Sequence, residues 1–360
     1  MTCAIGSIDR FRQTIISSKA SIGEAIAQLE NAGTGALLLC DGENFLRGLL
    51  TDGDLRRAIL KEISFDSPCE EIANPDPIVA PTNCQPDEAL RLMDHAREFV
   101  LNHLPIVNEA GQVVDLILRS DLISDERLQL SAMIMAGGFG KRLQPLTNDT
   151  PKPMLPIGDK PLLELTIRKL RKAGIRRVNV STHYLAEKIS DHFGDGKLFD
   201  VDIKYIREDQ PLGTAGGLRL LEGQSETLLV INGDIVTDVD FRSMLAYHRE
   251  HRADVTVGVC RYELKVPYGV IECNGSWVKR VREKPVLPFL VNAGIYILEP
   301  AVCRFIPEDD TFDMTDLIER LVENHKQVIS FPIVESWLDI GQKADYERAQ
   351  RNFENGVARI

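Results

Sequence analysis

An apolar run that ends in a cluster of glycines is the feature that most constrains the fold of this chain. Residues 130–136 are almost entirely apolar and suit a buried parallel strand. Gly137, Gly138 and Gly140 follow at once, and glycine lets a backbone adopt conformations closed to other residues and approach an anion closely. Such a loop directs several backbone N–H groups inward, which suits phosphate oxygens. The run therefore predicts a strand that leads into an anion-binding loop.

Strands and helices alternate after this loop. The expected strands cover residues 178–180, 201–206, 227–231 and 255–259, and the expected helices cover 162–173, 185–193, 215–221, 241–252 and 343–355. This alternation predicts an α/β fold in which helices cover both faces of a mostly parallel sheet. Ligands of such sheets bind beyond the carboxyl ends of the strands. We therefore expect the functional residues in the loops that follow strands.

The first third of the chain repeats one pattern, in units of about 14–62 and 75–125. Each unit has a helix, two strands around a turn, and an acidic residue at the start of a last helix. Asp54 and Asp121 take this same place in their units. The repeat predicts a domain over residues 1–125, a linker over 126–131 and a larger domain over 132–360.

Charge and cysteine content exclude several classes of protein. The net charge is −12, with 11 basic and 21 acidic residues up to Leu130 and 31 and 33 after it. This balance argues against a nucleic-acid partner. The seven cysteines form no close pair, which favours reduced thiols over a zinc site or disulfides. No apolar run is long enough to span a bilayer, so we expect a cytoplasmic protein with no membrane partner.

Two cations and two acids lie in the glycine loop and the later loops. Arg142 and Lys152 follow the glycines, and a purely structural turn would not need them. Asp234 ends an apolar run, and Asp339 lies beside Gly341 after another. Carboxylates in these positions suit a hard metal ion such as magnesium, held against a triphosphate. For Asp234 alone, a helix cap or turn residue is the simpler interpretation.

Three further loops have the composition of substrate loops, one of them the close-approach turn at Gly269. Gln210, Gly213 and Thr214 open a helix, whose free N–H groups can face a base or a sugar. Glu283 can accept hydrogen bonds from sugar hydroxyls, and Lys284 can pair with a phosphate. The alternative for this dipeptide is a solvated charge pair.

Residues 132–355 resemble the sugar-phosphate nucleotidyltransferases, also called nucleotide-sugar pyrophosphorylases. The segments Gly-Gly-Phe-Gly-Lys-Arg-Leu, Pro-Lys-Pro, Asn-Gly-Asp, Glu-Lys-Pro, Asn-Ala-Gly and Trp-Leu-Asp-Ile-Gly occur in the order of that family. The resemblance implies a Rossmann-like domain that transfers a nucleoside monophosphate from a nucleoside triphosphate to a sugar 1-phosphate and releases pyrophosphate. The attacking phosphate is already a nucleophile, so catalysis is alignment and charge neutralisation.

The resemblance also implies a role for each site residue. Arg142 and Lys152 are catalytic, and Asp234 and Asp339 bind magnesium. The nucleotide-binding residues are Ala136, Gly137, Gly138, Gly140, Lys141, Gln210, Gly213, Thr214 and Asp234. The sugar-phosphate-binding residues are Gly269, Glu283, Lys284 and Asn292. Lys141 stands where many members have threonine or serine, which matters little if the loop contacts are made by the backbone.

The first third resembles a tandem CBS (Bateman) pair, an α/β domain whose clefts often bind adenosine nucleotides. The resemblance implies that Asp54 and Asp121 hold a ribose and that Thr51 lies beside it. The second unit has Leu118 in place of that hydroxyl. The alternative is a CBS pair that serves only for dimerisation or as a spacer.

The order of the two domains resembles the glucosamine-1-phosphate guanylyltransferases of nonulosonic (legionaminic) acid pathways. It favours GTP and glucosamine 1-phosphate as substrates, a nucleotide sugar for surface-glycan synthesis as product, and a homo-oligomer. Mannose-1-phosphate guanylyltransferase and glucose-1-phosphate uridylyl- or thymidylyltransferase are alternatives. A non-catalytic nucleotide-sensing regulator is the alternative of another class.

Overall fold

The computed structural model describes residues 8–94, 101–122, 128–221, 223–308 and 311–354. The chain divides into two compact units, Met1–Leu128 with Leu245–His251 and Gln129–Met244 with Arg252–Ile360. Within the described residues, no helix is both long and apolar enough to cross a bilayer. Strand β7 begins at Leu130, so the last two residues of the expected linker belong to the strand.

The first unit contains two three-stranded sheets with the same topology. In each sheet the first strand pairs parallel with the second, and the second pairs antiparallel with the third. One repeat consists of α1 (Ile8–Gln13), β1 (Ile15–Ser17), α2 (Ile22–Ala32), β2 (Ala36–Cys40), β3 (Leu46–Thr51) and α3 (Asp52–Leu60). The other consists of β4 (Ala80–Pro81), α4 (Pro86–Asp94), β5 (His103–Val107), β6 (Val113–Leu118) and α5 (Arg119–Leu122), after the short helix η1 (Cys69–Glu71). The repeat in the sequence is therefore a repeat in the fold.

The second unit is built on a seven-stranded mixed sheet. Its strands lie in the order β11 (Asp202–Arg207), β10 (Arg177–Thr182), β7 (Leu130–Met135), β12 (Thr227–Asn232), β17 (Val286–Leu298), β14 (Val255–Lys265) and β18 (Val328–Ile333). Only the pairs that include β17 are antiparallel. This sheet confirms the expected Rossmann-like α/β fold.

Helices and short elements complete the second unit. The helices are α6 (Leu162–Lys172), α7 (Ala186–Phe193), α8 (Gly213–Gly216), α10 (Met314–Glu323) and α11 (Lys343–Glu354), while α9 (Phe241–Glu250) begins in this unit and its residues from Leu245 belong to the first. The 3-10 turns are η2 (Lys141–Leu143), η3 (Lys152–Met154), η4 (Lys197–Phe199), η5 (Gly217–Leu220) and η6 (Pro300–Phe305). The short strands are β8 (Pro156–Ile157), β9 (Lys160–Pro161), β13 (Ile235–Thr237), β15 (Val270–Asn274), β16 (Trp277–Arg282) and β19 (Trp337–Asp339). The helix expected over 215–221 is instead the four-residue α8 followed by η5.

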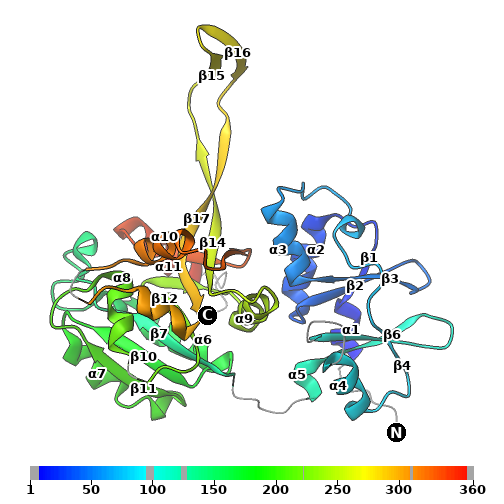
Figure 1. The fold of residues 1–360 in the computed structure, drawn as a ribbon, viewed down its shortest axis with the longest axis horizontal. Coiled ribbons are helices and arrows are strands. Elements are labelled where there is room, and N and C mark those ends of the chain that lie inside the picture. Colours follow the sequence, from blue (N-terminus) through cyan, green and yellow to red (C-terminus); the bar gives the residue numbers. More distant parts are fainter. Residues whose placement is uncertain (1–7, 95–100, 123–127, 222, 309–310, 355–360) are drawn as a thin grey trace. The chain divides into compact units, whose positions relative to one another are not determined.

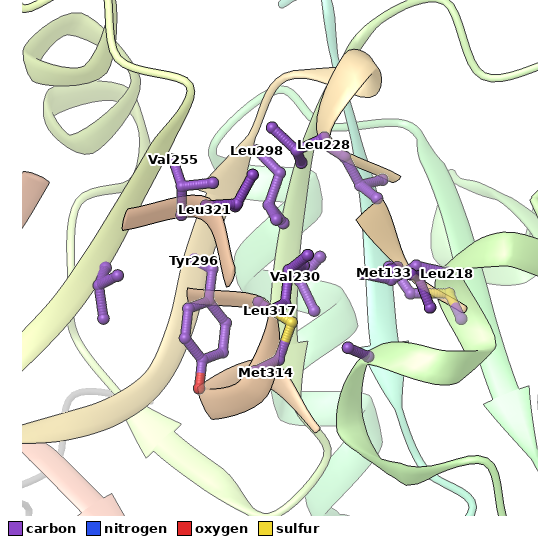
Figure 2. Packing of buried hydrophobic residues seen from close by; sticks show 14 of the residues in the cluster. Met133, Leu218, Leu228, Val230, Val255, Tyr296, Leu298, Met314, Leu317 and Leu321 are labelled. Atoms are coloured by element: carbon purple, nitrogen blue, oxygen red, sulfur yellow. The ribbon is translucent and has the colours of Figure 1, made fainter. Parts of the chain in front are cut away.

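The hydrophobic core lies between the central strands and α10 (Figure 2). Met133 and Val230 come from neighbouring strands, and Leu317 and Leu321 face them from α10. All four side chains are buried. Replacing a buried side chain such as that of Leu317 with alanine lowers the free energy of unfolding by about 2–5 kcal/mol. This packing therefore holds the central strands and the loops after them in fixed positions.

The two central strands end side by side. Asn232, the last residue of β12, pairs with Met135, the last residue of β7. The N–H of Gly233 donates to the carbonyl of Met135 (2.9 Å), and a Cβ on Gly233 would lie 2.7 Å from that oxygen. Only glycine fits this close approach. The glycine loop after β7 and the turn after β12 therefore start from one point.

Strands β14 and β17 continue beyond the sheet as a long two-stranded ribbon, drawn in yellow and gold in Figure 1. They pair from Arg261 opposite Leu290 to Lys265 opposite Val286. The separate hairpin of β15 and β16 lies at the end of the ribbon. The strand expected over 255–259 is thus only the first half of β14.

Candidate active site

The glycine loop is fixed at one end and open at the other. Gly140 has a φ of +62°, and its carbonyl accepts a hydrogen bond from Thr147 Oγ1 (2.8 Å). A Cβ on Gly140 would lie 2.9 Å from Thr147 Cγ2 and 3.2 Å from Lys152 Cβ, whereas a Cβ on Gly138 would meet no atom within 4 Å. Gly138 therefore faces open space of the kind a phosphate could enter.

Two predicted residues of this loop have partners within the chain. The N–H of Ala136 donates to the carbonyl of Ser181 (3.1 Å) and is not free for a nucleotide. The ammonium of exposed Lys141 lies 5.4 Å from the centroid of the Phe139 ring, a favourable cation–π contact. Gly137 lies beside Ser181, His183 and Glu208, each 3.5–3.6 Å from the position of a Cβ.

A lysine and two carboxylates from three separate motifs meet beside the loop. Lys152 Nζ lies 2.5 Å from Asp234 Oδ2. Strands β13 and β19 pair so that Ile235 is opposite Asp339. The N–H of Ile340 donates to the backbone carbonyl of Asp234 (3.0 Å). The structure therefore brings Lys152, Asp234 and Asp339 together.

The electrostatics of Asp339 place Arg142 in the same group. Burial raises the pKa of Asp339, and the negative charge of Asp234 raises it further. Lys152 and Arg142 act in the opposite direction. The exposed side chain of Arg142 is therefore close enough to interact with the carboxylates while it remains accessible to a ligand.

Asp234 and Asp339 fit a hard divalent cation. Among the described residues, no group of three or more Asp, Glu, His or Cys side chains could hold a metal ion. Small hard cations are often held by one or two carboxylates, with substrate phosphates and water as the other ligands. A cation here would also offset the repulsion from Asp234 that raises the pKa of Asp339. The donor set suits a metal shared with a phosphate substrate.

The loop of Gln210, Gly213 and Thr214 corrects one expectation. The N–H groups at the start of α8 are not free, because Asp313 Oδ1 accepts from the N–H (2.8 Å) and hydroxyl (3.1 Å) of Thr214. The carbonyl of Phe312 accepts from the next two N–H groups. Gly213 has a φ of +82°, and a Cβ there would lie 2.5 Å from that carbonyl. Gln210 is exposed, so a base would meet this residue and the loop surface rather than a helix N-terminus.

Two residues that sequence reasoning missed hold this loop. One is Asp313, which also caps α10. The other is buried Glu208, which accepts hydrogen bonds from the hydroxyl of Ser181 and, through Oε2, from the N–H of Leu212 (3.1 Å). Glu208 directly precedes the Asp-Gln-Pro-Leu-Gly segment, but its burial leaves no signal in one sequence.

The predicted sugar-phosphate residues separate into two places. Asn292 lies within the sheet, where its Oδ1 accepts from the N–H of Gly294 (2.9 Å). Gly269 and Glu283 are together on the ribbon, because a Cβ on Gly269 would lie 3.0 Å from Glu283 Oε2. Val286 is six residues from Asn292 along β17, or about 20 Å, and Glu283 and Lys284 lie beyond it. Within one chain, Gly269, Glu283 and Lys284 do not reach the carboxylates.

The predicted nucleotide residues of the first unit are engaged in local contacts. Thr51 and Asp54 form a capping box at the start of α3, with Thr51 Oγ1 donating to Asp54 Oδ2 (2.7 Å). Asp54 Oδ1 pairs with Arg57 Nη2 (2.7 Å). Asp121 lies in α5. A ribose at Asp54 would have to replace one of these partners.

Family profiles match both units. The profile of the family described as "Nucleotidyl transferase" matches residues 131–356. The "CBS domain" profile matches twice, over residues 12–61 and 69–126.

Curated relatives match somewhat less than two thirds of this chain. They include a UTP–glucose-1-phosphate uridylyltransferase of Synechocystis sp., 35% identical over 62% of this chain and 63% of that protein. A mannose-1-phosphate guanylyltransferase of Mycobacterium tuberculosis is 30% identical over 64% and 66%. One described as mannose-1-phosphate guanyltransferase, of Schizosaccharomyces pombe, is 34% identical over 60% and 62%. The chain thus spans slightly less than two thirds of the length of these relatives.

Solved structures agree on the fold. HddC from Yersinia pseudotuberculosis matches with a TM-score of 0.50 at 27% identity, over 62% of this chain and 99% of that one. A Bacillus anthracis structure in complex with sucrose matches with a TM-score of 0.52 at 24% identity, over 62% and 94%. The second likeness supports the fold alone.

Proposed function

We propose, because the chain belongs to the nucleotidyl transferase family, that it transfers a nucleoside monophosphate from a nucleoside triphosphate to a sugar 1-phosphate and releases pyrophosphate. One observation carries the proposal. Lys152, Asp234 and Asp339 meet beside the glycine loop, and Arg142 lies within electrostatic reach of them. A cation-rich loop beside paired carboxylates is what chemistry at a polyphosphate requires.

The reaction needs alignment more than acid–base help. An oxygen of the sugar 1-phosphate attacks the α-phosphorus, the bond between that phosphorus and the β-bridging oxygen breaks, and pyrophosphate leaves with the electron pair. The attacking oxygen is already anionic, so no general base and no covalent enzyme intermediate are needed. Arg142 would neutralise charge that spreads over the α-phosphate and the leaving group, since its guanidinium forms paired hydrogen bonds to such oxygens. Lys152 would hold a phosphate while Asp234 keeps its ammonium in place.

Magnesium is the cation we propose for Asp234 and Asp339. When bound, it would offset the negative charge that the phosphates of the two substrates bring to the site. We propose that the triphosphate approaches the loop at Gly138, where a Cβ would meet no atom within 4 Å.

GTP and glucosamine 1-phosphate are the substrates we propose, with the product used in surface-glycan synthesis. The guanylyltransferase names of two relatives support the choice of GTP. Mannose 1-phosphate is the alternative acceptor for the same reason, and the uridylyltransferase relative supports UTP and glucose 1-phosphate as another pair.

The test is pyrophosphate release, measured with four nucleoside triphosphates against a panel of sugar 1-phosphates. Asp234→Asn should reduce the rate about 10²–10³-fold while the protein stays folded, because Lys152 and the cation lose their charged partner. Asp238→Asn is the matched control, since Asp238 pairs with another lysine, Lys169 (2.6 Å). A near-normal rate for Asp234→Asn would contradict the site. If no pair of substrates yields pyrophosphate, the result would instead favour a nucleotide-sensing regulator.

We further propose that an adenine nucleotide binds the first CBS repeat and modulates the rate. The ribose would take the place of Arg57 or Thr51 on the carboxylate of Asp54, and Asp121 offers the corresponding position in the second repeat. Adenine nucleotides should then raise the melting temperature, and Asp54→Asn should remove this shift. The proposal fails if no adenine nucleotide changes either the melting temperature or the rate.

A further inference from the structure

The two-stranded ribbon of residues 261–290, called the arm below, lacks the support that the rest of the sheet has. Strand β18 pairs with β14 only as far as Cys260. Beyond it β14 and β17 pair with each other alone, and β15 and β16 do the same. Figure 1 shows the arm projecting away from the sheet. A two-stranded hairpin without further packing is marginally stable in water, so the arm needs a surface to cover it.

The apolar side chains of the arm also need a surface to pack against. Large apolar residues are exposed along its length, among them Tyr262, Tyr268 (74% exposed), Ile271, Trp277 (82% exposed), Val281 and Phe289. Soluble monomers rarely leave so many neighbouring apolar side chains in water, and such surfaces mark interaction sites. Trp and Tyr are also the residues that most often dominate binding energy at interfaces.

The charge of the arm indicates the kind of surface that covers it. The arm has six basic and three acidic residues, while the rest of the chain has 36 basic and 51 acidic residues. Opposite charge favours association and fixes its orientation. A second copy of this chain is therefore a partner whose overall charge is opposite to that of the arm.

The site after β12 has one buried acceptor that the described residues leave unmatched. Asn232 Oδ1 is buried and accepts no hydrogen bond from the described residues. Lys284 and Glu283 lie on the arm, about 20 Å or more from Asn292 along β17. The site thus has room for a further donor, and the arm carries Lys284 out of reach of its own chain.

We propose that two copies of this chain exchange arms. Each arm covers its apolar side chains on the carboxyl edge of the other copy's sheet, where Lys284 and Glu283 complete the sugar-phosphate side of that copy's active site. The exchange is reciprocal, so one two-fold axis generates both sites. The catalytic part of this proposal rests on the proposed function, and the assembly part does not.

A heterodimer tests the catalytic part. One copy carries Asp234→Asn and the other Lys284→Ala, each with its own affinity tag, and the doubly tagged dimer is isolated after co-expression. Each variant alone should be inactive. With exchanged arms the copy that keeps Asp234 receives an intact Lys284, so one of two sites is complete and the heterodimer should have about half the wild-type rate of pyrophosphate release. If each arm serves its own chain, neither site is complete and the heterodimer stays inactive, which overturns the proposal.

Sedimentation separates a failure of the proposed function from a failure of the exchange. Wild-type protein should have twice the 40.2 kDa mass of one chain, and Trp277→Asp should be a monomer, because a charge in the centre of an apolar interface is costly. Leu198→Asp is the control, since Leu198 is 93% exposed and lies outside the arm. A wild-type monomer, or a dimer that persists in Trp277→Asp, overturns the exchange whether or not pyrophosphate is released. A dimer that depends on Trp277 but shows no turnover overturns the proposed function and leaves an arm-mediated dimer.

Discussion

Substitution of Gly140 by alanine tests whether the glycine loop holds Lys152 in place. Gly140 has a φ of +62°, and a residue with a side chain pays about 1–2 kcal/mol in this left-handed region. The added Cβ would also lie 2.9 Å from Thr147 Cγ2. Thr147 is buried and bonded to the carbonyl of Gly140, so it cannot move aside freely. We expect Gly140→Ala to cost about 2–3 kcal/mol in all.

This cost should be visible in both stability and rate. For a unit of this size, 2–3 kcal/mol lowers the melting temperature by roughly 4–10 °C, which calorimetry can measure. The same Cβ would press on Lys152 Cβ at 3.2 Å. A shift of about 1 Å in a positioning group can lower a rate by about 10²-fold, so the rate of pyrophosphate release should fall by at least tenfold.

Gly138→Ala is the matched control in the same loop. Its Cβ would meet no atom within 4 Å, and its φ is not left-handed, so its melting temperature should stay within about 2 °C of wild type. Its nucleotide KM should rise, since the Cβ would fill space proposed for a phosphate. Equal melting temperatures and rates for Gly140→Ala and wild type would refute the reasoning.

Asp313, Glu208 and the buried cysteines allow three further tests. Asp313→Ala removes a helix cap worth about 1 kcal/mol and frees the loop at Thr214. Steady-state kinetics should therefore show a higher nucleotide KM with little change in kcat. An unchanged KM would argue against a nucleotide role for this loop. Glu208→Ala leaves the N–H of Leu212 and the hydroxyl of Ser181 without their buried acceptor, which should cost about 2–3 kcal/mol in denaturant titrations; a cost below about 0.5 kcal/mol would contradict this. Burial raises the pKa of Cys260 to about 12 and of Cys40 to about 11, above the 9.0 of a free thiol. As the pH rises, the thiols therefore ionise in the unfolded chain before they ionise in the folded protein. The melting temperature should fall as the pH rises from about 9 to 11. In Cys260→Ala this fall should be shallower, and an equal slope would be evidence against the raised pKa of Cys260.

The strands of the sheet could be predicted because their burial shows in the sequence. Strand β2 is an unbroken apolar run, and β12 is one up to the polar Asn232, so both could be placed within a residue or two. The residues that follow β7 and β12 could be placed at one edge because parallel strands end together. Lys152 and Asp234 come from segments that follow these two strands, whereas the antiparallel pairing of β13 with β19 brings Asp339 to them.

The arm could not be predicted by the same reasoning. Beyond Cys260 strand β14 is exposed on both faces, so no core imposes a regular alternation of apolar and polar residues. The position of Lys284 far from the carboxylates follows from this long ribbon alone. The sequence motif identifies Lys284 as a candidate, but only the fold indicates whether it can reach the carboxylates of its own chain.

Long-range capping was hidden as well. Asp313 is about a hundred residues from Thr214 in the sequence, and either residue alone is typical of a helix start. Because Asp313 accepts from the N–H of Thr214, this N–H is not free, although the sequence suggested that it was. Glu208 is similar, because a buried glutamate is chemically identical to an exposed one until its partners are known.

The central claim is that Lys152, Asp234 and Asp339 form a site for nucleotidyl transfer. Its most direct test is the simultaneous quantification of pyrophosphate and nucleotide sugar formed by wild-type protein and by Asp234→Asn from a nucleoside triphosphate and a sugar 1-phosphate. We predict equimolar products with at least one pair, GTP and glucosamine 1-phosphate first, and a loss of about 10²–10³-fold in the variant. The absence of both products from wild-type protein with every pair would contradict the claim.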